Sequence, residues 1–323
     1  MYGLLWDAGR ARAGQPVTLE AVAGGGSGAL EYRFVEFEYA TGRWSVIREY
    51  AASNRVEWTP PPGSGGEYSV QVWVRETGSA AAYDAWGGAP LTLGPARLLV
   101  ISGRGGDPVS AGRSLSVPLS EVTSYSSKMI VGAVDDAGRW QGEFDTTRAP
   151  WVTGVFEGAV GAVSFAPTLY VRHTSTSCSS NTGRFTVNDA TIDPDGVLTA
   201  LSIDFEQRCD GATEPLFGGL RYNSNVPLVY AMSVTPSTTA TTAGALVTFT
   251  GIASSALDAV EYRFAVLHQE TGQWTVVREY AAQNTVTWTA PSPGTYVIQL
   301  WVRRRGSTAS YESYVNGPPL TAR

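Results

Sequence analysis

Hydrophobic and polar residues alternate in several short stretches of the chain. In residues 68–75 the apolar side chains fall on one face, and they are Tyr68, Val70, Val72 and Val74. Residues 16–23, 198–209 and 245–252 show the same period of two. Alternation of this kind indicates β-strands that bury one face and expose the other. We therefore expect short strands, each packed on a core along one side.

An internal repeat is the strongest signal in the sequence. Residues 31–60 align without a gap to residues 261–290, with 17 identities in 30 positions. After a two-residue deletion the match resumes, so that residues 68–75 pair with residues 296–303. The chain therefore carries one domain twice.

The repeat defines three modules. We assign residues 1–94 to the first copy, residues 228–323 to the second, and residues 95–227 to a different domain between them. Within that middle domain we expect nine strands, at 96–102, 114–118, 128–134, 139–145, 154–157, 169–173, 183–189, 198–209 and 216–222. Turn residues separate these stretches. The predicted fold class is all-β, with three β-sandwich modules in a row.

Composition supports strands and excludes several classes of function. The chain holds 36 Gly and 18 Pro with only 16% charged residues, which is typical of strands and turns rather than amphipathic helices. A net charge of −6 offers no general attraction to nucleic acid. No stretch is long and apolar enough to predict membrane insertion, and residues 1–12 lack the pattern of a signal peptide. We take the chain as a mature or cropped form.

Residues that carry most enzyme and metal chemistry are scarce. Two His and two Cys in 323 residues exclude most histidine-based catalysis and nearly every Cys/His metal cluster, so we predict no metal site and no cofactor. Residues 193–196, Asp-Pro-Asp-Gly, are typical of a type I turn, since the further oxygen ligands of a calcium loop are missing. The two cysteines, Cys178 and Cys209, are either free thiols or one disulfide.

Each repeat carries a motif that opens its late strand. The motif is Gly-Glu-Tyr-Ser-Val at residues 66–70 and Gly-Thr-Tyr-Val-Ile at residues 294–298. It resembles the tyrosine corner of immunoglobulin-like sandwiches. Both repeats are similar to fibronectin type III, PKD and related Ig-like modules of bacterial extracellular proteins. The resemblance implies an Ig-like fold for both ends of the chain.

The middle domain has its own signature, Asp-Phe-Glu-Gln-Arg-Cys-Asp-Gly at residues 204–211, between Asn-Thr-Gly-Arg-Phe-Thr-Val at residues 181–187 and a Gly-Gly segment at residues 216–224. Together these resemble a module that recurs in secreted bacterial multidomain proteins. The resemblance implies export to the extracellular space or cell surface and a Cys178–Cys209 disulfide, and it attaches no biochemical activity. Arg208 stands where the module is expected to have His, which argues against an essential histidine at that position.

An acidic pair is one candidate site. Asp204 and Glu206 share a strand face and are spaced as a glycosidase acid/base pair would be. Carboxylates on one strand face more often lie in solvent or pair across the sheet, here with Arg221 or Arg208. A pocket that holds both groups favours an enzyme, whereas a flat face or a pair with Arg221 favours a structural role. Neither His173 nor His268 has a recognisable catalytic partner in the sequence.

Paired aromatic residues are a second candidate. Planar rings flanked by Gln, Asn and Arg suit stacking on sugar rings. The candidate stacking residues are Trp73, Trp301, Trp44 and Trp274. The competing interpretation is structural, with Arg75 or Arg303 lying over a tryptophan of the same strand as a cation–π contact.

These observations predict a non-catalytic extracellular protein that serves as a surface, adhesive or structural scaffold and not as an enzyme. Its expected partners are glycans or other copies of itself, because open sheet edges can be extended by another chain. One alternative is a carbohydrate-binding module set of a secreted polysaccharide-degrading system. The other is a carboxylate-dependent hydrolase in the middle domain, centred on Asp204 and Glu206.

Overall fold

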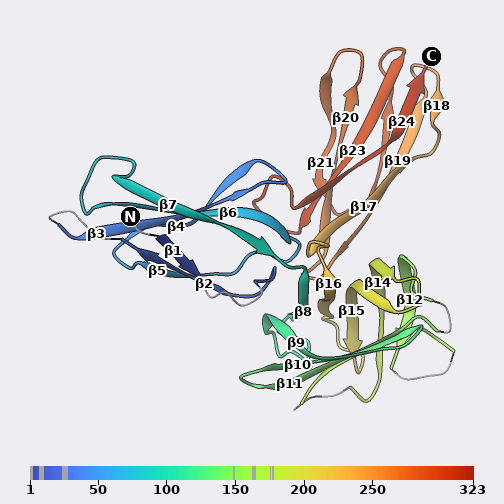
Figure 1. Ribbon diagram of the computed structural model, residues 1–323. Helices are drawn as coiled ribbons and strands as arrows, with labels where there is room; N and C mark the ends of the chain where they lie inside the picture. The colour runs from blue at the N-terminus through green and yellow to red at the C-terminus, as the bar shows by residue number, and fades with distance from the viewer. Residues whose placement is uncertain are drawn as a thin grey trace. The chain divides into compact units, whose positions relative to one another are not determined.

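The protein is all-β, as a computed structural model shows (Figure 1). The structure describes residues 3–6, 11–23, 28–147, 150–161, 165–174, 176 and 178–323, and within them every regular element is a strand. In this part of the chain no helix is long and apolar enough to cross a membrane. The all-β prediction is confirmed.

The chain divides into two compact units. The first comprises residues 1–97 with 222–225, and the second comprises residues 98–221 with 226–323. The first unit contains the first repeat, and the second unit contains most of the middle domain and the second repeat. Each unit is described on its own.

The first repeat is a sandwich of two sheets. One sheet has the order β1 (Gly3–Trp6), β2 (Val17–Val22), β5 (Arg55–Trp58). The other has the order β4 (Arg43–Ala51), β3 (Leu30–Glu38), β6 (Gly66–Glu76), β7 (Ala85–Leu93). The apolar face predicted for residues 68–75 lies in the core, where Val70 and Val72 are fully buried.

The second repeat has the same architecture. Its smaller sheet has the order β17 (Val229–Pro236), β19 (Leu246–Ser255), β22 (Thr285–Thr289). Its larger sheet has the order β18 (Ala240–Thr241), β24 (Ser313–Ala322), β23 (Gly294–Arg304), β20 (Val260–His268), β21 (Gln273–Ala281). The strand register is also retained, since Arg33 lies opposite Trp73 in the first copy and Arg263 opposite Trp301 in the second.

The middle domain contains the nine expected strands. They are β8 (Ala96–Ser102), β9 (Ser114–Ser124), β10 (Lys128–Asp135), β11 (Gly138–Asp145), β12 (Gly154–Val160), β13 (Thr168–His173), β14 (Asn181–Ile192), β15 (Leu198–Cys209) and β16 (Leu216–Ser224).

Here the structure differs from the predicted sandwich, because the sheet closes on itself as a barrel in the order β10-β11-β13-β12-β14-β15-β16-β8-β9. Closure depends on β16 pairing with β8 from the other end of the domain. A strand pattern does not reveal such a long-range pairing.

Aromatic side chains fill the barrel. Trp140, Phe144 and Phe185 are fully buried, and the rings of Phe144 and Phe205 lie 5.7 Å apart between centroids. Cys178 and Cys209, which the sequence alone left open, form a disulfide that ties the segment before β14 to the end of β15. The disulfide therefore fastens two neighbouring strands that carry the domain's signature motif.

Candidate functional site

The strand β15 carries the acidic pair of the sequence analysis. It lies antiparallel to β14, and its side chains alternate between the barrel interior and the outer face. Phe205 points into the barrel, while Asp204 and Glu206 point outward. Asp204 is nevertheless only 3% exposed, because the outer face of β15 lies against β19 of the second repeat within the same unit.

Three side chains surround the Asp204 carboxylate. Arg221 Nη1 lies 2.8 Å from Oδ1 in an ion pair in which both side chains are buried. Asn188 Nδ2 donates a hydrogen bond to Oδ2 at 2.8 Å. The Ser254 hydroxyl lies 2.6 Å from both Asp204 Oδ2 and Asn188 Oδ1, and it donates its single proton to either oxygen. The carboxylate is thus enclosed by fixed partners from β14, β16 and β19.

Arg221 connects this cluster to the segment that joins the barrel to the second repeat. Its Nε donates to the Val226 carbonyl at 2.8 Å and its Nη2 to the Pro227 carbonyl at 2.7 Å. Nη1 donates to the Ile203 carbonyl at 2.9 Å, so this nitrogen acts on Asp204 Oδ1 mainly through its charge. A fully buried guanidinium with this set of acceptors fixes the path of the connecting chain.

Glu206 lies in ion pairs that are more open. Its Oε1 accepts from Arg208 at 3.0 Å, and its Oε2 lies 3.4 Å from Arg184. Arg184 also lies 3.6 Å from Glu157. Both carboxylates that the sequence suggested are therefore paired with arginine. The two partners named from the sequence, Arg221 and Arg208, are observed, and Arg184, which lies across the sheet from Glu206, is a further partner that was not named.

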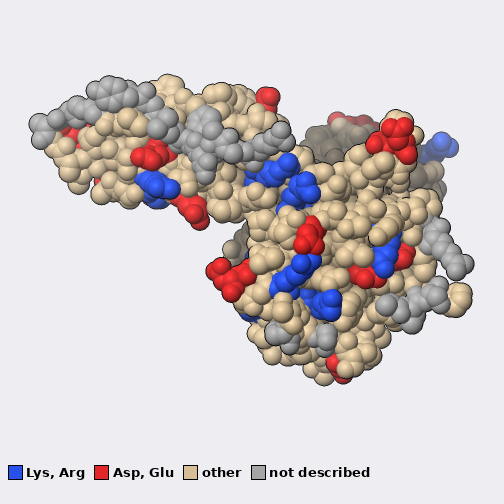
Figure 2. Space-filling view, turned by 60° about the horizontal axis from the view of Figure 1, so that its bottom comes forward, with Lys and Arg blue, Asp and Glu red and all other residues tan. Residues whose placement is uncertain are grey.

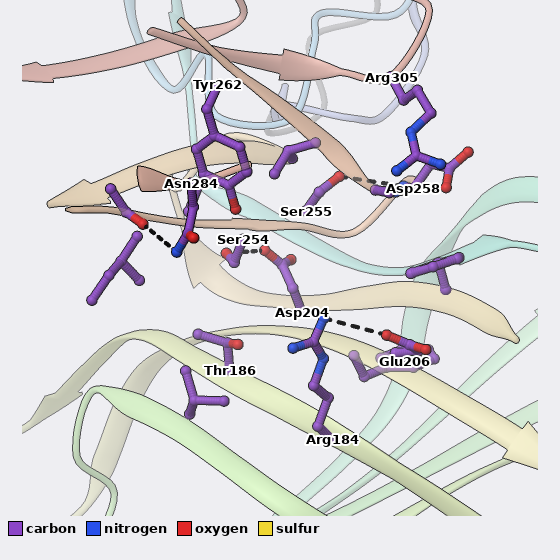
Figure 3. Close-up of a pocket in the computed structure, with 18 of the residues that line it drawn as sticks. Arg184, Thr186, Asp204, Glu206, Ser254, Ser255, Asp258, Tyr262, Asn284 and Arg305 are labelled. Atoms are coloured by element: carbon purple, nitrogen blue, oxygen red, sulfur yellow. Dashed lines mark hydrogen bonds and ion pairs between the residues drawn. The ribbon is translucent and has the colours of Figure 1, made fainter. Parts of the chain in front are cut away.

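Asp204 and Glu206 line a cleft of about 450 Å³ between the barrel and the second repeat (Figure 3). Figure 3 shows Arg184 pointing toward Glu206 from the barrel side, with Tyr262 and Asn284 on the opposite side. Burial raises the pKa of Tyr262, and nearby Arg184 partly offsets that rise. Although the cleft contains both carboxylates, Asp204 is buried and held by Arg221, Asn188 and Ser254.

A second set of contacts lies at the same junction. Arg104 binds Asp258 and lies 3.2 Å from Glu214, while the Ser102 hydroxyl donates to the Leu257 carbonyl. Ala256 is fully buried, and a Cβ added at Gly219 would lie 2.6 Å from the Ala256 Cβ. The turn formed by residues 254–258 therefore makes close polar and apolar contact with the barrel.

We call these contacts the barrel joint, and it includes residues that the sequence analysis did not single out. They are Asn188, Ser254, Asp258 and Arg104. A signal was present in the repeat alignment, because residues 254–258 are Ser-Ser-Ala-Leu-Asp whereas the aligned residues 24–28 are Gly-Gly-Gly-Ser-Gly. The second copy therefore has side chains that contact the barrel at positions where the sequence of the first copy is rich in glycine.

The tryptophans of the second candidate site lie on the outer face of the larger sheet in each repeat. Arg33 lies over the Trp73 ring at 5.0 Å, and Arg263 lies over the Trp301 ring at 4.4 Å. The prediction that Arg75 or Arg303 would cover these rings is wrong. Those two arginines are 3.9 Å from the rings of their neighbouring tyrosines, Tyr50 and Tyr280.

Strand register explains why Arg33, and not Arg75, lies over the Trp73 ring. Arg33 lies directly opposite Trp73 on the neighbouring strand, whereas Arg75 is opposite Glu31 and forms an ion pair with it at 2.5 Å. Cross-strand neighbours are closer than residues two apart on one strand. Trp73 and Trp301 are therefore largely packed, while Trp44 and Trp274 are 52% and 49% exposed.

The two histidines lie in different domains, and neither is part of the acidic site. His173 is buried in the barrel with its ring 4.7 Å from that of Trp140. His268 belongs to the second repeat, where its Nδ1 lies 3.4 Å from Glu270. Among the described residues, no group of three or more His, Cys, Asp or Glu side chains is placed to hold a metal ion.

No family model matches the chain, and no curated protein matches it. Among solved structures, it is similar to a run of titin domains, with 11% identity over 99% of this chain and 97% of that one, at a TM-score of 0.22. It is also similar to the FN1–FN3 domains of chicken CNTN1, with 10% identity, 99% and 98% coverage and a TM-score of 0.22. The chain is a multidomain all-β protein in which two like sandwiches flank a barrel.

Proposed function

We propose that this chain is a non-catalytic scaffold segment of an extracellular surface protein. The observation that carries the proposal is the buried Asp204–Arg221 ion pair, which also engages Ser254 of the second repeat and the connecting chain at Val226 and Pro227. The buried ion pair and its hydrogen bonds thus connect the barrel to the second repeat.

Catalysis by the two carboxylates is poorly supported by this geometry. A glycosidase needs one carboxyl to act as an acid and the other as a base or nucleophile, each reaching the substrate. Asp204 is 3% exposed and surrounded by fixed partners, and Glu206 faces two arginines. Both carboxylates are thus engaged by arginines of the chain itself, whereas a glycosidase pair must face its substrate.

The disulfide supports an extracellular setting. Disulfides persist in oxidising compartments and are rare in reducing ones, so the Cys178–Cys209 bond fits an exported chain. An extracellular setting also fits the modules of bacterial extracellular proteins that both repeats resemble.

Comparison of two carboxylate variants tests the proposal. The wild-type chain, Asp204→Asn and Glu206→Gln are incubated with nitrophenyl glycosides and neutral polysaccharides, and the melting temperature of each is measured. We expect no hydrolysis by any of the three, a clear loss of stability in Asp204→Asn, and a change within about 0.5 kcal/mol in Glu206→Gln. Hydrolysis by the wild type that disappears in Glu206→Gln without a loss of stability would overturn the proposal.

A further inference from the structure

Each repeat exposes the same set of large apolar side chains on its larger sheet. Trp44 corresponds to Trp274, Val46 to Val276, Tyr83 to Tyr311 and Trp86 to Tyr314. In the first copy these residues are 52%, 46%, 44% and 54% exposed, and in the second they are 49%, 42%, 39% and 52% exposed. We call this set, with the strands beneath it, the outer aromatic face.

Some other positions of the repeat that lie outside the core have diverged. The aligned pairs Glu38 and His268, and Tyr39 and Gln269, differ in charge or polarity. Folding does not require an exposed tryptophan, and exposed apolar clusters promote unwanted association. The shared apolar set at matching exposure therefore indicates a binding role that both copies have kept.

The strand order spreads the rings across the sheet. Trp44 lies on the edge strand β4 and Trp86 on the opposite edge strand β7, with β3 and β6 between them. The registers place Trp44 in line with Phe37 and Ser69, and Trp86 beside Trp73 four residue pairs further along, so all these side chains share one face. Three strand spacings separate the two edges by about 14 Å, which suits an extended ligand of several rings.

Polar groups fill the centre of the outer aromatic face as balanced pairs. Arg33 pairs with Glu49 at 3.0 Å and Arg75 with Glu31 at 2.5 Å, and the second copy has the same pairs at 3.0 Å and 3.1 Å. In the view of Figure 2, acidic and basic side chains are likewise interspersed over the visible surface. The face therefore has no excess charge that would select an anionic ligand.

The combination favours a neutral glycan over a second copy of the chain. Packing two such faces together would remove four ion pairs from water, and desolvating charged groups is costly unless each gains good partners. Sugar hydroxyls both donate and accept hydrogen bonds, so they satisfy arginine, glutamate and the amide of Gln71 without removing these pairs. The apolar faces of sugar rings meanwhile pack on exposed indole and phenol rings.

We propose that the outer aromatic face of each repeat binds a neutral oligosaccharide of several residues, with Trp44 and Trp86 as stacking platforms in the first copy and Trp274 and Tyr314 in the second. This inference goes beyond the scaffold role and does not depend on the barrel joint. It makes the chain a carrier of two equivalent glycan sites.

The test uses the full chain on an array of neutral hexasaccharides built from glucose, xylose, galactose or N-acetylglucosamine, with uronic-acid hexasaccharides as the acidic series. We expect binding within the neutral series. Trp44→Ala and Trp274→Ala should each weaken it, and the double variant should weaken it roughly tenfold or more. Trp44→Phe should retain most of the binding, because a planar ring remains.

Tyr125→Ala is the matched control, since Tyr125 is a 58% exposed aromatic residue of the barrel, outside both faces. Unchanged melting temperatures show that the exposed-site variants still fold. Absence of binding to every neutral glycan, or binding that the double variant leaves intact, overturns the proposal. So does an association between copies, measured by light scattering, that depends on Trp44 and Trp274. None of these outcomes bears on hydrolysis or on Asp204.

Discussion

At the scale of single residues, two carboxylates differ in whether other side chains compensate their charge: Asp204, which is buried, and Glu36, which is half-buried. Asp204 is compensated by Arg221, Asn188 and Ser254. Glu36 is not, since its Oε2 is buried without a hydrogen-bond partner among the described residues. Burial raises the pKa of Glu36 to about 7, and the neighbouring Glu38 carboxylate adds to the rise. Asp204 therefore stabilises the contact between the barrel and the second repeat, whereas Glu36 in its charged form lowers the free energy of unfolding.

Replacing Arg221 tests the first case. Arg221→Met keeps much of the volume but leaves Asp204 charged and buried, and it frees the Val226 and Pro227 carbonyls. We expect a loss of about 3–5 kcal/mol in the free energy of unfolding, measured by urea denaturation. Adding Asp204→Asn should recover part of the loss, because the uncompensated charge is then gone. Equal stabilities of the wild type and Arg221→Met would show that the ion pair is unimportant.

Glu36 predicts a pH dependence, and the second repeat supplies the natural comparison, because the aligned residue is Val266. A glutamate whose pKa is higher in the folded state binds its proton more tightly there. Below about pH 4.5 Glu36 is protonated in both the folded and the unfolded state, so it does not lower the free energy of unfolding. As the pH rises through about 7 the folded state must lose this proton, and the free energy of unfolding falls.

Glu36→Val should stabilise the first repeat by about 1–2 kcal/mol at pH 8, after allowance for partial exposure, with a smaller gain at pH 4. Thermal unfolding at both pH values measures this. Glu57→Val, at an exposed position of the same repeat, should show no such change with pH. A gain from Glu36→Val that is the same at both pH values would contradict the assigned pKa.

At the scale of elements, sequence alternation located the strands well and their long-range pairing poorly. The predicted strand at 198–209 matches β15 at both ends, and the prediction of 96–102 matches β8. Local period and turn residues determine these bounds. Closure of the barrel depends on which distant strands meet, and the sequence of one strand does not reveal this.

In the candidate site, too, the sequence predicted some contacts and missed those that depend on how strands are placed against one another. Two carboxylates on one strand face predicted that Asp204 and Glu206 would pair with nearby arginines. Both arginines named from the sequence, Arg221 and Arg208, are observed as partners. Ser254 was missed because its role arises only when β19 is placed against β15. Asn188 was missed because its bond to Asp204 depends on how β14 pairs with β15, where the register shifts next to Asn188. The cation–π partner of Trp73 was assigned along its own strand, whereas register places Arg33 beside it.

Reduction of the disulfide should destabilise the barrel whose strands it joins. Cys178 and Cys209 are separated by 31 positions, and in the chain-entropy model a loop of that size contributes about 3–4 kcal/mol to stability. Denaturation with and without reductant should show the barrel destabilised by this amount. The first repeat has no cysteine, so its unfolding should not change and serves as the internal control. A reductant effect on both would point to a cause other than the disulfide.

At the scale of the whole molecule, duplication was followed by specialisation of one copy. Both repeats have the outer aromatic face, and in the second repeat residues 254–258 also contact the barrel. Ser254, Ala256, Leu257 and Asp258 make those contacts, and the first copy has Gly-Gly-Gly-Ser-Gly in the aligned segment. One copy of the domain thus combines with the barrel into a single unit, which is the arrangement expected of a scaffold.

Calorimetry of a turn exchange tests this account most directly. Residues 254–258 are replaced by Gly-Gly-Gly-Ser-Gly from the first copy, and the heat capacity of the full chain is followed through unfolding. If these residues couple the two domains, the barrel and the second repeat unfold together in the wild type and in two separate transitions after the exchange. An unfolding profile that the exchange leaves unchanged would contradict this coupling.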